Sequence, residues 1–435
     1  MLTAFARAFR TPDLRKKLLF TLFIVVLFRI GSALPTPGVS TAGVNECVKT
    51  VTSGSQANVY ALVNLFSGGS LLKLSVFALG IMPYITASII LQLLTVVIPR
   101  LEELKKEGQA GQGKITQYTR YLTIGLGVLQ ATGIVAMART GNLFQNACDP
   151  SQIIPNTSIF TVVTMVITMV AGTAVIMWLG ELITDRGVGN GMSLLIFSQI
   201  IAVFPSEFGN IMRQKGGFIF AIVIIVGLAI VAGVIFVEQA QRRIPVQYAK
   251  RMVGRRMYGG TSTYIPLKVN QAGVIPVIFA SSLLYIPSLV AQMLGSGNPF
   301  ADWVNRYLVK GDHPIYMIGY FLLIIGFTYF YVAITFNPTE VADNMKKYGG
   351  FIPGIRPGRP TAEYLDYVLT RITTPGALYL GLIALIPMVA LAMVSATQNF
   401  PFGGTSILIM VGVGLDTVKQ IESQLQQRNY EGFLR

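Results

Sequence analysis

The sequence is poor in charged residues, and this scarcity excludes an ordinary soluble domain. Charged residues make up 12% of the 435 residues and hydrophobic residues 52%, with a mean hydropathy of +0.60. A soluble domain carries about 25% charged residues. A large part of this chain therefore faces lipid or is buried among other apolar segments.

Cysteine and histidine are almost absent, which excludes a cysteine–histidine metal cage. The chain has two cysteines, Cys47 and Cys148, and one histidine, His313, whereas tetrahedral zinc takes four ligands, or three and a water. His313 stands beside Asp312 and Pro314 with no nucleophile motif near it, so we interpret it as a loop residue. We expect no metal, no cofactor and no catalytic site.

Long apolar runs alternate with short polar segments and predict ten membrane-spanning helices. A span needs about 20 mostly apolar residues. The basic N-terminal residues precede a run without a small-residue cleavage site, which favours a retained first span over a removed signal peptide. The fifth and tenth runs are short, and glycines flank the fifth and interrupt the tenth, as is typical of helices that border a cavity. The ten runs are 18–34, 74–97, 118–138, 158–183, 192–208, 217–237, 272–294, 314–336, 374–395 and 402–420.

The distribution of lysine and arginine predicts the orientation. If the N-terminus is cytoplasmic, 26 of the 34 basic residues fall on the cytoplasmic side, as the positive-inside rule requires. The net charge of +15 therefore reports topology, because the basic residues lie in clusters between apolar runs and not in one stripe for nucleic acid. We expect both ends of the chain to be cytoplasmic in a multi-pass plasma-membrane protein.

Two predicted cytoplasmic loops are long and basic. The flanks of the loop at 238–271 alternate like strands, with Gly259-Gly260 as a turn signal. The loop at 338–373 carries GGFIPGIRPGRP at 349–360, whose glycines and prolines exclude a helix and favour an ordered, exposed tip. Arg255, Arg256 and Arg356 lie well away from the span ends, so we interpret the loops as docking sites for partners in addition to membrane anchors.

Ionisable residues are missing from the middle of the spans. Arg29 lies near an outer end, and Glu181, Asp185 and Asp416 lie near inner ends. Ion-coupled transporters usually carry mid-membrane charges, so their absence disfavours a secondary transporter of small solutes. An intramembrane enzyme is disfavoured as well, because the sequence shows no set of catalytic residues within the spans. The sequence RGVGNG at 186–191 predicts a tight turn and not a phosphate loop. Uncharged polar residues remain, whose default role is hydrogen bonding between helices: Thr86, Ser88, Gln92, Gln130, Asn270, Gln271, Ser281 and Ser282.

The segment at 58–72 is half-apolar, too short to cross a bilayer, and interrupted by Gly68-Gly69. It is either a re-entrant, plug-like element or an interfacial helix.

Long sequence strings spread over essentially the whole chain form a recognisable set. They are FRIGS at 28–32, NLFSGGSL at 64–71, FALGIMPYITASIILQLLT at 77–95, KITQYTRY at 114–121, TDRGVGNGMS at 184–193, QRRIPVQYAKR at 241–251, PLKVNQAGVIPVIFASS at 266–282, FIPGIRPG at 351–358 and FGGTS at 402–406. In these strings the chain resembles the SecY family, the pore-forming subunits of bacterial protein-export channels.

This resemblance implies an all-α membrane fold with ten helices in two inverted five-helix halves around a central pore. The halves would be 18–208 and 209–420, with a cytoplasmic N-terminus at 1–17 and a cytoplasmic tail at 421–435. A ring of apolar side chains would form the constriction, since dewetting blocks ions. The matching ring positions are Ile81, Ile85, Met192, Ile196, Ile278 and Ile409, of which Met192 departs from the more usual isoleucine. Without the resemblance, the same six residues would be interpreted as ordinary residues of the hydrophobic core.

The resemblance also implies a plug, a lateral gate and docking sites. The plug residues would be Asn64, Phe66, Ser67, Gly68 and Gly69, and the lateral-gate residues Thr86, Gln92, Gln130, Asn270, Ser282 and Ile286. Docking would use Arg242, Arg243, Lys250, Arg251, Arg255, Arg256, Arg356 and Arg359. The implied partners are the small membrane subunits SecE and SecG, the SecA ATPase, the ribosome, SecDF and YidC, with signal peptides and nascent chains as substrates and membrane lipid at the gate. The two cysteines fall in outer loops, where a disulfide can form, and the sequence leaves open whether they meet.

Overall fold

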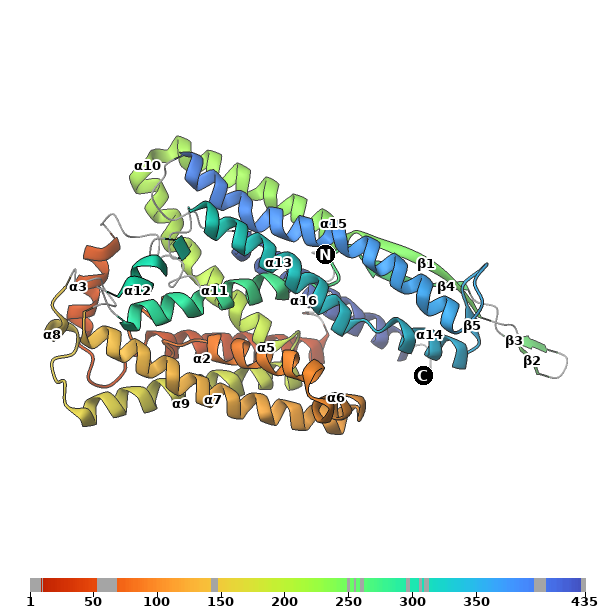
Figure 1. The fold of residues 1–435 in the computed structure, drawn as a ribbon, viewed down its shortest axis with the longest axis horizontal. Helices are drawn as coiled ribbons and strands as arrows, with labels where there is room; N and C mark the ends of the chain where they lie inside the picture. The colour runs from red at the N-terminus through yellow and green to blue at the C-terminus, as the bar shows by residue number, and fades with distance from the viewer. Residues whose placement is uncertain are drawn as a thin grey trace.

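The structure is a computed structural model that describes residue 9 and residues 11–52, 69–141, 148–248, 251–253, 256–258, 262–294, 298–304, 307–308, 313–394 and 404–431. Long helices run side by side along the long axis of the molecule (Figure 1). They are α2 (Pro12–Ala33), α5 (Met82–Val97), α7 (Gln109–Arg139), α9 (Ile159–Arg186), α10 (Gly191–Gln239), α11 (Ile275–Leu294), α13 (Pro314–Thr335), α15 (Arg359–Val394) and α16 (Gly404–Glu431).

Short helices and strands gather at opposite ends of this bundle (Figure 1). One end carries α3 (Thr41–Thr52), α8 (Pro150–Ile153) and α12 (Pro299–Val304). The other end carries α6 (Pro99–Lys106), α14 (Pro338–Lys347), and the strands β1 (Gln241–Tyr248), β2 (Arg251–Val253), β3 (Arg256–Tyr258), β4 (Ser262–Lys268) and β5 (Gly350–Phe351).

Each of the ten predicted apolar runs coincides with a helix or part of one. The fifth and sixth runs share α10, which is kinked at Gly216, where φ is 81° and ψ is 168°. A residue with a side chain rarely adopts this positive φ, whereas glycine does so readily. The tight turn expected at 186–191 is confirmed: α9 ends at Arg186, and the side chain of Asn190 accepts hydrogen bonds from the first amides of α10.

The second predicted span begins later than its hydropathy indicates. The run starts at residue 74, but α5 starts only at Met82, and residues 69–81 form turns. Long-range contacts hold these turns, because Thr36 donates from its backbone N and its Oγ1 to the carbonyl of Leu74, at 3.0 and 2.6 Å. Leu74 is fully buried, so this irregular backbone meets the requirement that non-helical segments at membrane depth be enclosed by protein.

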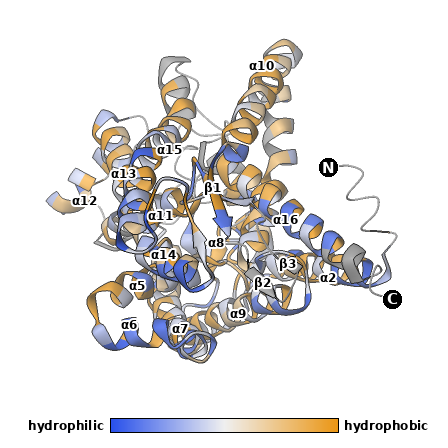
Figure 2. Cartoon of the chain, turned by 90° about the vertical axis from the view of Figure 1, so that its right-hand side faces the viewer, coloured by the Kyte–Doolittle hydropathy of each residue, from blue (hydrophilic) through white to orange (hydrophobic). Residues whose placement is uncertain are grey.

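Five of the described helices are long and apolar enough to span a membrane. A sixth span results if α5 and α6, which are bent by 100° at their junction, are taken together. The beginnings of α10 and α11 are apolar but shorter, at Gly191–Pro205 and Ile275–Leu284. Figure 2 shows hydrophobic residues along α10 and α15, and hydrophilic residues on α6 and α14 at the end that carries the sheet. The bundle thus has an apolar flank and a polar end.

A three-stranded antiparallel sheet joins the two predicted cytoplasmic loops. Its order is β4-β1-β5, and β1 pairs with β4 along its length and with β5 through Gln247↔Phe351 and Tyr248↔Gly350. The strand-like flanks of the first loop are confirmed as β1 and β4. Between them β2 and β3 form a separate two-stranded ribbon, and Gly259 and Gly260 lie outside the described residues.

Candidate functional site

The six predicted ring residues come from four helices or helix starts and meet in one apolar cluster. Ile81 precedes α5, Met192 and Ile196 lie on the first part of α10, Ile278 lies on α11, and Ile409 lies on α16. Ile81, Ile196 and Ile409 are buried in this cluster, and Ile85, Met192 and Ile278 pack against it half-buried. The fold therefore gathers apolar side chains that are distant in sequence at one place inside the bundle.

Two glycines let α10, which carries Met192 and Ile196, approach α9 closely. A Cβ on Gly191 would overlap the backbone carbonyl of Gly180 on α9, and a Cβ on Gly180 would overlap the side chain of Met192. Because neither glycine has a side chain, the start of α10, which includes Met192, packs directly against α9.

Among the predicted gate residues, Thr86 and Gln92 belong to α5, Gln130 to α7 and Ser282 to α11, and the contact of α11 with α5 and α7 forms a seam between these helices. Thr86 donates to the Met82 carbonyl of its own helix at 3.0 Å, and Gln92 and Gln130 are half-buried. The Ser282 hydroxyl is buried with no hydrogen-bond partner among the described residues. The side chain of Ile286 lies outside the described part of the structure.

Asn270 does not reach across this seam. Its Nδ2 donates to Glu238 Oε1 at 2.6 Å and to the Gly273 carbonyl at 3.1 Å. Thr86 therefore bonds within α5, and Asn270 bonds to α10 and to the turn before α11, so neither side chain bonds across the seam. A hydrogen bond between other helices is present at the sheet end, where Lys105 Nζ of α6 donates to the Ile334 carbonyl of α13 at 3.4 Å.

Glu238 is a residue that the sequence analysis missed. It was assigned to the loop at 238–271, but it lies in the last turn of α10 and is only 8% exposed. The sequence did contain a signal, because Glu238 directly follows the strongly apolar run at 217–237. If the helix continues past this run, the carboxylate is buried and needs a hydrogen-bond donor.

The predicted docking residues lie on the sheet end. Arg242 and Arg243 are exposed on β1, and the Arg243 guanidinium lies 4.9 Å from the ring centre of Tyr264, a favourable cation–π distance. Arg251 and Arg256 belong to β2 and β3, whereas Lys250 and Arg255 lie outside the described residues.

The tip at 349–360 is ordered and exposed, as predicted. Ile352 is buried and Ile355 packs against the same apolar cluster under the sheet. Arg356 is exposed between them and the start of α15, and its carbonyl accepts from Thr361 Oγ1 at 2.8 Å. Arg359 forms an ion pair with Glu363 at 3.0 Å, so its charge is partly compensated.

The predicted plug falls mostly outside the described residues. This applies to Asn64, Phe66, Ser67 and Gly68, while Gly69 begins the described turns with a φ of 84°.

A bidentate ion pair links α7 to α9 near the sheet end. Arg120 Nε and Nη2 donate to Glu181 Oε1 and Oε2 at 2.9 and 2.7 Å. The pair borders a cavity of about 490 Å³ lined also by Met177, Trp178, Leu182 and Asp185, none of which belongs to the ring. Sequence analysis noted Glu181 but missed its partner, because a contact between residues 61 apart leaves no local pattern.

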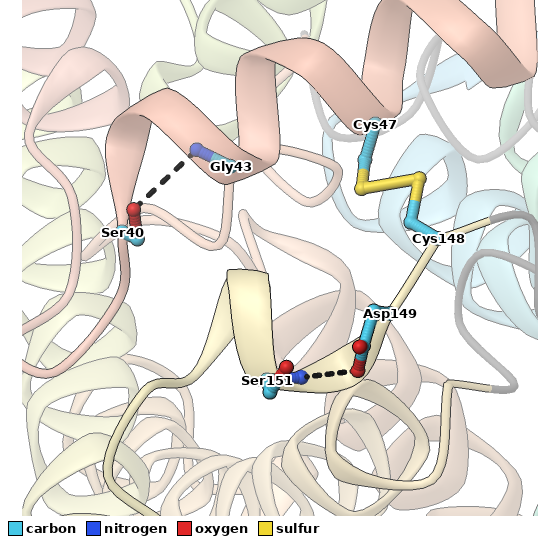
Figure 3. The surroundings of a disulfide bond; sticks show 6 residues. All are labelled: Ser40, Gly43, Cys47, Cys148, Asp149 and Ser151. Atoms are coloured by element: carbon cyan, nitrogen blue, oxygen red, sulfur yellow. Dashed lines mark hydrogen bonds between the residues drawn. A yellow bond between two sulfur atoms is a disulfide. The ribbon is translucent and has the colours of Figure 1, made fainter.

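The two cysteines meet at the opposite end. Cys47 on α3 and Cys148 form a disulfide with a Cα–Cα distance of 5.8 Å (Figure 3). Asp149 follows directly and caps α8, where its carboxylate accepts from the Ser151 amide at 3.1 Å. His313 caps α13 by accepting from the Ile315 amide at 3.2 Å, which gives this histidine a structural role. No group of three or more potential metal ligands occurs among the residues that the structure describes.

Known proteins match this chain along most or all of its length. A family model described as SecY matches residues 75–418. The protein translocase subunits SecY of Streptomyces galbus and Mycobacterium bovis are 71% and 63% identical over 439 and 443 residues, with 100% of both chains covered in each comparison. Among solved structures, one described as a protein-conducting channel has a TM-score of 0.61 at 20% identity, and Sec61 in a canine ribosome–channel complex has 0.56 at 20%. Both alignments cover 94% of this chain and 91% of the other.

Proposed function

This chain belongs to the SecY family, and we propose that its apolar cluster is the constriction that passes an unfolded polypeptide while holding back ions. The chain is the protein-conducting channel subunit of a translocase in the membrane, and it is not an enzyme. Its fold is the ten-helix membrane fold of this family, in two five-helix halves around a pore.

This proposal rests on the finding that all six ring residues belong to one apolar cluster. They are Ile81, Ile85, Met192, Ile196, Ile278 and Ile409. A narrow gap lined by apolar side chains dewets, so it resists ions without a charged filter. Aliphatic side chains and the flexible thioether of Met192 also adapt to a passing chain of any sequence.

Site-specific crosslinking tests the proposal directly. A photoreactive residue at 278 should crosslink to a secretory chain stalled during export into membrane vesicles. Residue 225 is the matched control, because Ile225 lies on the second part of α10 and is 67% exposed on the apolar flank. Equal crosslinking from both positions, or none from residue 278, would overturn the assignment.

The contact of α11 with α5 and α7 is the proposed lateral gate. A signal peptide or a transmembrane segment would leave the pore for lipid by parting these helices, and the half-buried Gln130 of α7 is one of the predicted gate residues on them. An apolar replacement of Asn270 should shift gating and allow export of substrates with weak signals. Unchanged export of such substrates would contradict this role.

The sheet end is the proposed docking surface for the SecA motor and for ribosomes. Arg356 is exposed on an ordered tip, and Arg242 and Arg243 stand on the strand that pairs with it. Exposed arginines suit ribosomal phosphates and acidic surfaces. Arg356→Glu should abolish motor-driven export in a protein of normal abundance, whereas Arg359→Glu should cost less, because Arg359 is already paired with Glu363. Normal export by Arg356→Glu would refute the assignment.

The proposed assembly includes SecE and SecG, with SecDF and YidC as further partners. Its orientation places both chain ends in the cytoplasm. The start of α2 and the last turns of α16 support this, because Leu14 and Ile421 pack with Val188 in the turn between α9 and α10. A membrane-impermeant thiol reagent should label a single cysteine placed near either end only after the vesicles expose their cytoplasmic face.

The segment at 58–72 is the proposed plug on the outer side of the constriction. In one solved structure, which resembles this chain with a TM-score of 0.61, the plug domain of the SecY protein is described as stabilising the closed state of the translocation channel. Gly69, with its positive φ, stands where this segment meets the turns before α5, and deleting 58–68 should raise ion leakage through resting vesicles.

A further inference from the structure

A buried carboxylate lies at the root of the gate helix. Glu238 is 8% exposed and Asn270 is 3% exposed, and 2.6 Å separates Asn270 Nδ2 from Glu238 Oε1. The two residues come from different segments, since Glu238 ends α10 and Asn270 lies between β4 and α11. Burying a carboxylate is costly unless it receives a hydrogen bond, so this contact fixes both segments.

The same amide nitrogen extends the connection to α11. Asn270 Nδ2 also donates to the Gly273 carbonyl at 3.1 Å. Gly273 has a φ of +62°, the sharp turn from which α11 starts two residues later. One side-chain amide thus ties the end of α10 to the turn that aims α11.

The neighbouring backbone is held from two further sides. The Val269 amide donates to the Ala240 carbonyl at 3.0 Å. On α15, Gly376 faces the Val269 carbonyl so closely that an added Cβ would overlap it. The segment before α11 is therefore fixed in the structure by contacts with both α10 and α15.

Beyond this turn, α11 carries the parts on which the proposed function depends. Ile278 packs against the ring cluster, and the helix contacts α5 and α7 along the proposed lateral gate. A rotation of the first turn of α11 would move both contacts together.

We propose that Glu238 is a positioning residue for the lateral gate: through Asn270 it fixes the first turn of α11 and so biases the seam toward its closed arrangement. The inference rests on the proposed function of α11 as a gate helix. Asn270 Oδ1 is buried without a partner among the described residues, so the amide is held from its nitrogen side, and loss of Glu238 removes the side-chain contact of Asn270 to α10.

The test uses the full translocase in membrane vesicles and two secretory reporters, one with an intact signal sequence and one with a weakened signal. Glu238→Ala should raise export of the weakened reporter about tenfold, which corresponds to about 1.4 kcal/mol in the closed–open equilibrium. Export of the intact reporter and channel abundance should stay unchanged. Glu103→Ala is the matched control, because Glu103 is an exposed acid on α6 and should alter neither reporter.

Inverting the hydrogen bond separates positioning from a general packing role. Asn270→Asp leaves two acids facing each other and should relax the gate. Adding Glu238→Gln restores an amide donor facing a carboxylate, now in the opposite direction, and should bring export of the weakened reporter back toward the wild-type level. Failure of the double variant to recover, at normal abundance, would overturn the inference.

A third comparison keeps the two proposals apart. If Asn270→Leu relaxes the gate but Glu238→Ala does not, the positioning role of Glu238 is wrong and the gate proposal stands. If engineered cysteines that lock α7 to α11 leave export of both reporters unchanged, the gate proposal itself fails.

Discussion

Ile409→Ser should make the resting channel leak ions, whereas Ile407→Ser should not. Both isoleucines lie on α16, are 1% and 0% exposed, and belong to the same apolar cluster. Only Ile409 occupies a predicted ring position. The two substitutions therefore remove the same side chain from equally buried sites and differ in whether the site lines the proposed constriction.

The magnitude follows from burial. Fully burying an isoleucine side chain stabilises by about 1.5–3 kcal/mol, so both variants should lose a similar amount of folding stability. At the constriction the same free energy also opposes the entry of water. If its loss favours the wetted state by about 1.5–3 kcal/mol, the wetted fraction rises about ten- to a hundredfold.

The assay is potassium efflux from vesicles that contain equal amounts of each purified translocase. Ile409→Ser should raise the efflux rate by at least an order of magnitude over wild type, while Ile407→Ser should match wild type and show a comparable loss of thermal stability. Equal leakage from the two variants would mean that general loosening of the core causes the leak, and the ring interpretation would then be wrong.

Three further predictions concern the ends of the bundle. The disulfide joins residues that are 101 positions apart in the sequence. On the chain-entropy model, Cys47→Ser should therefore lower the free energy of unfolding by about 4–5 kcal/mol. The thermal midpoint should fall, and a reducing agent should not lower it further. The Ser151 amide holds the pKa of Asp149 below its ordinary value of 3.8. The cap should therefore stabilise α8 above that value and be lost as the pH falls through the depressed pKa; amide exchange at Ser151 that does not change on acidification would contradict this. Arg120→Lys should lower the free energy of unfolding by under about 1 kcal/mol, because lysine cannot make the bidentate contact to the partly buried Glu181. An unchanged melting curve would show that the pair contributes nothing.

The helices were predictable because their signal is local. Apolar runs of sufficient length are found by composition alone, and Asn190 and Gly216 show in the sequence where α10 begins and bends. The start of α5 was predicted wrongly because the turns before it depend on Thr36, 38 residues away from Leu74. Hydropathy averages over a window and does not detect such a contact.

The candidate site was predictable only in part, for the same reason. The apolar ring positions came from the family resemblance, and composition alone could not have separated them from other core residues. The pairing of β1 with β5, the disulfide and the contact of Glu238 with Asn270 all join segments far apart in the chain. Each depends on a tertiary arrangement that no single-sequence pattern encodes.

The sheet at the polar end makes one mechanical unit of two loops that the sequence presents separately. β1 continues directly from α10, β4 leads into α11 through the segment at 269–274, and β5 precedes α15. A displacement of the three-stranded sheet is therefore passed to the end of α10 and to the starts of α11 and α15 together. A partner that bound this sheet would thereby act on three helices of the bundle from its polar end.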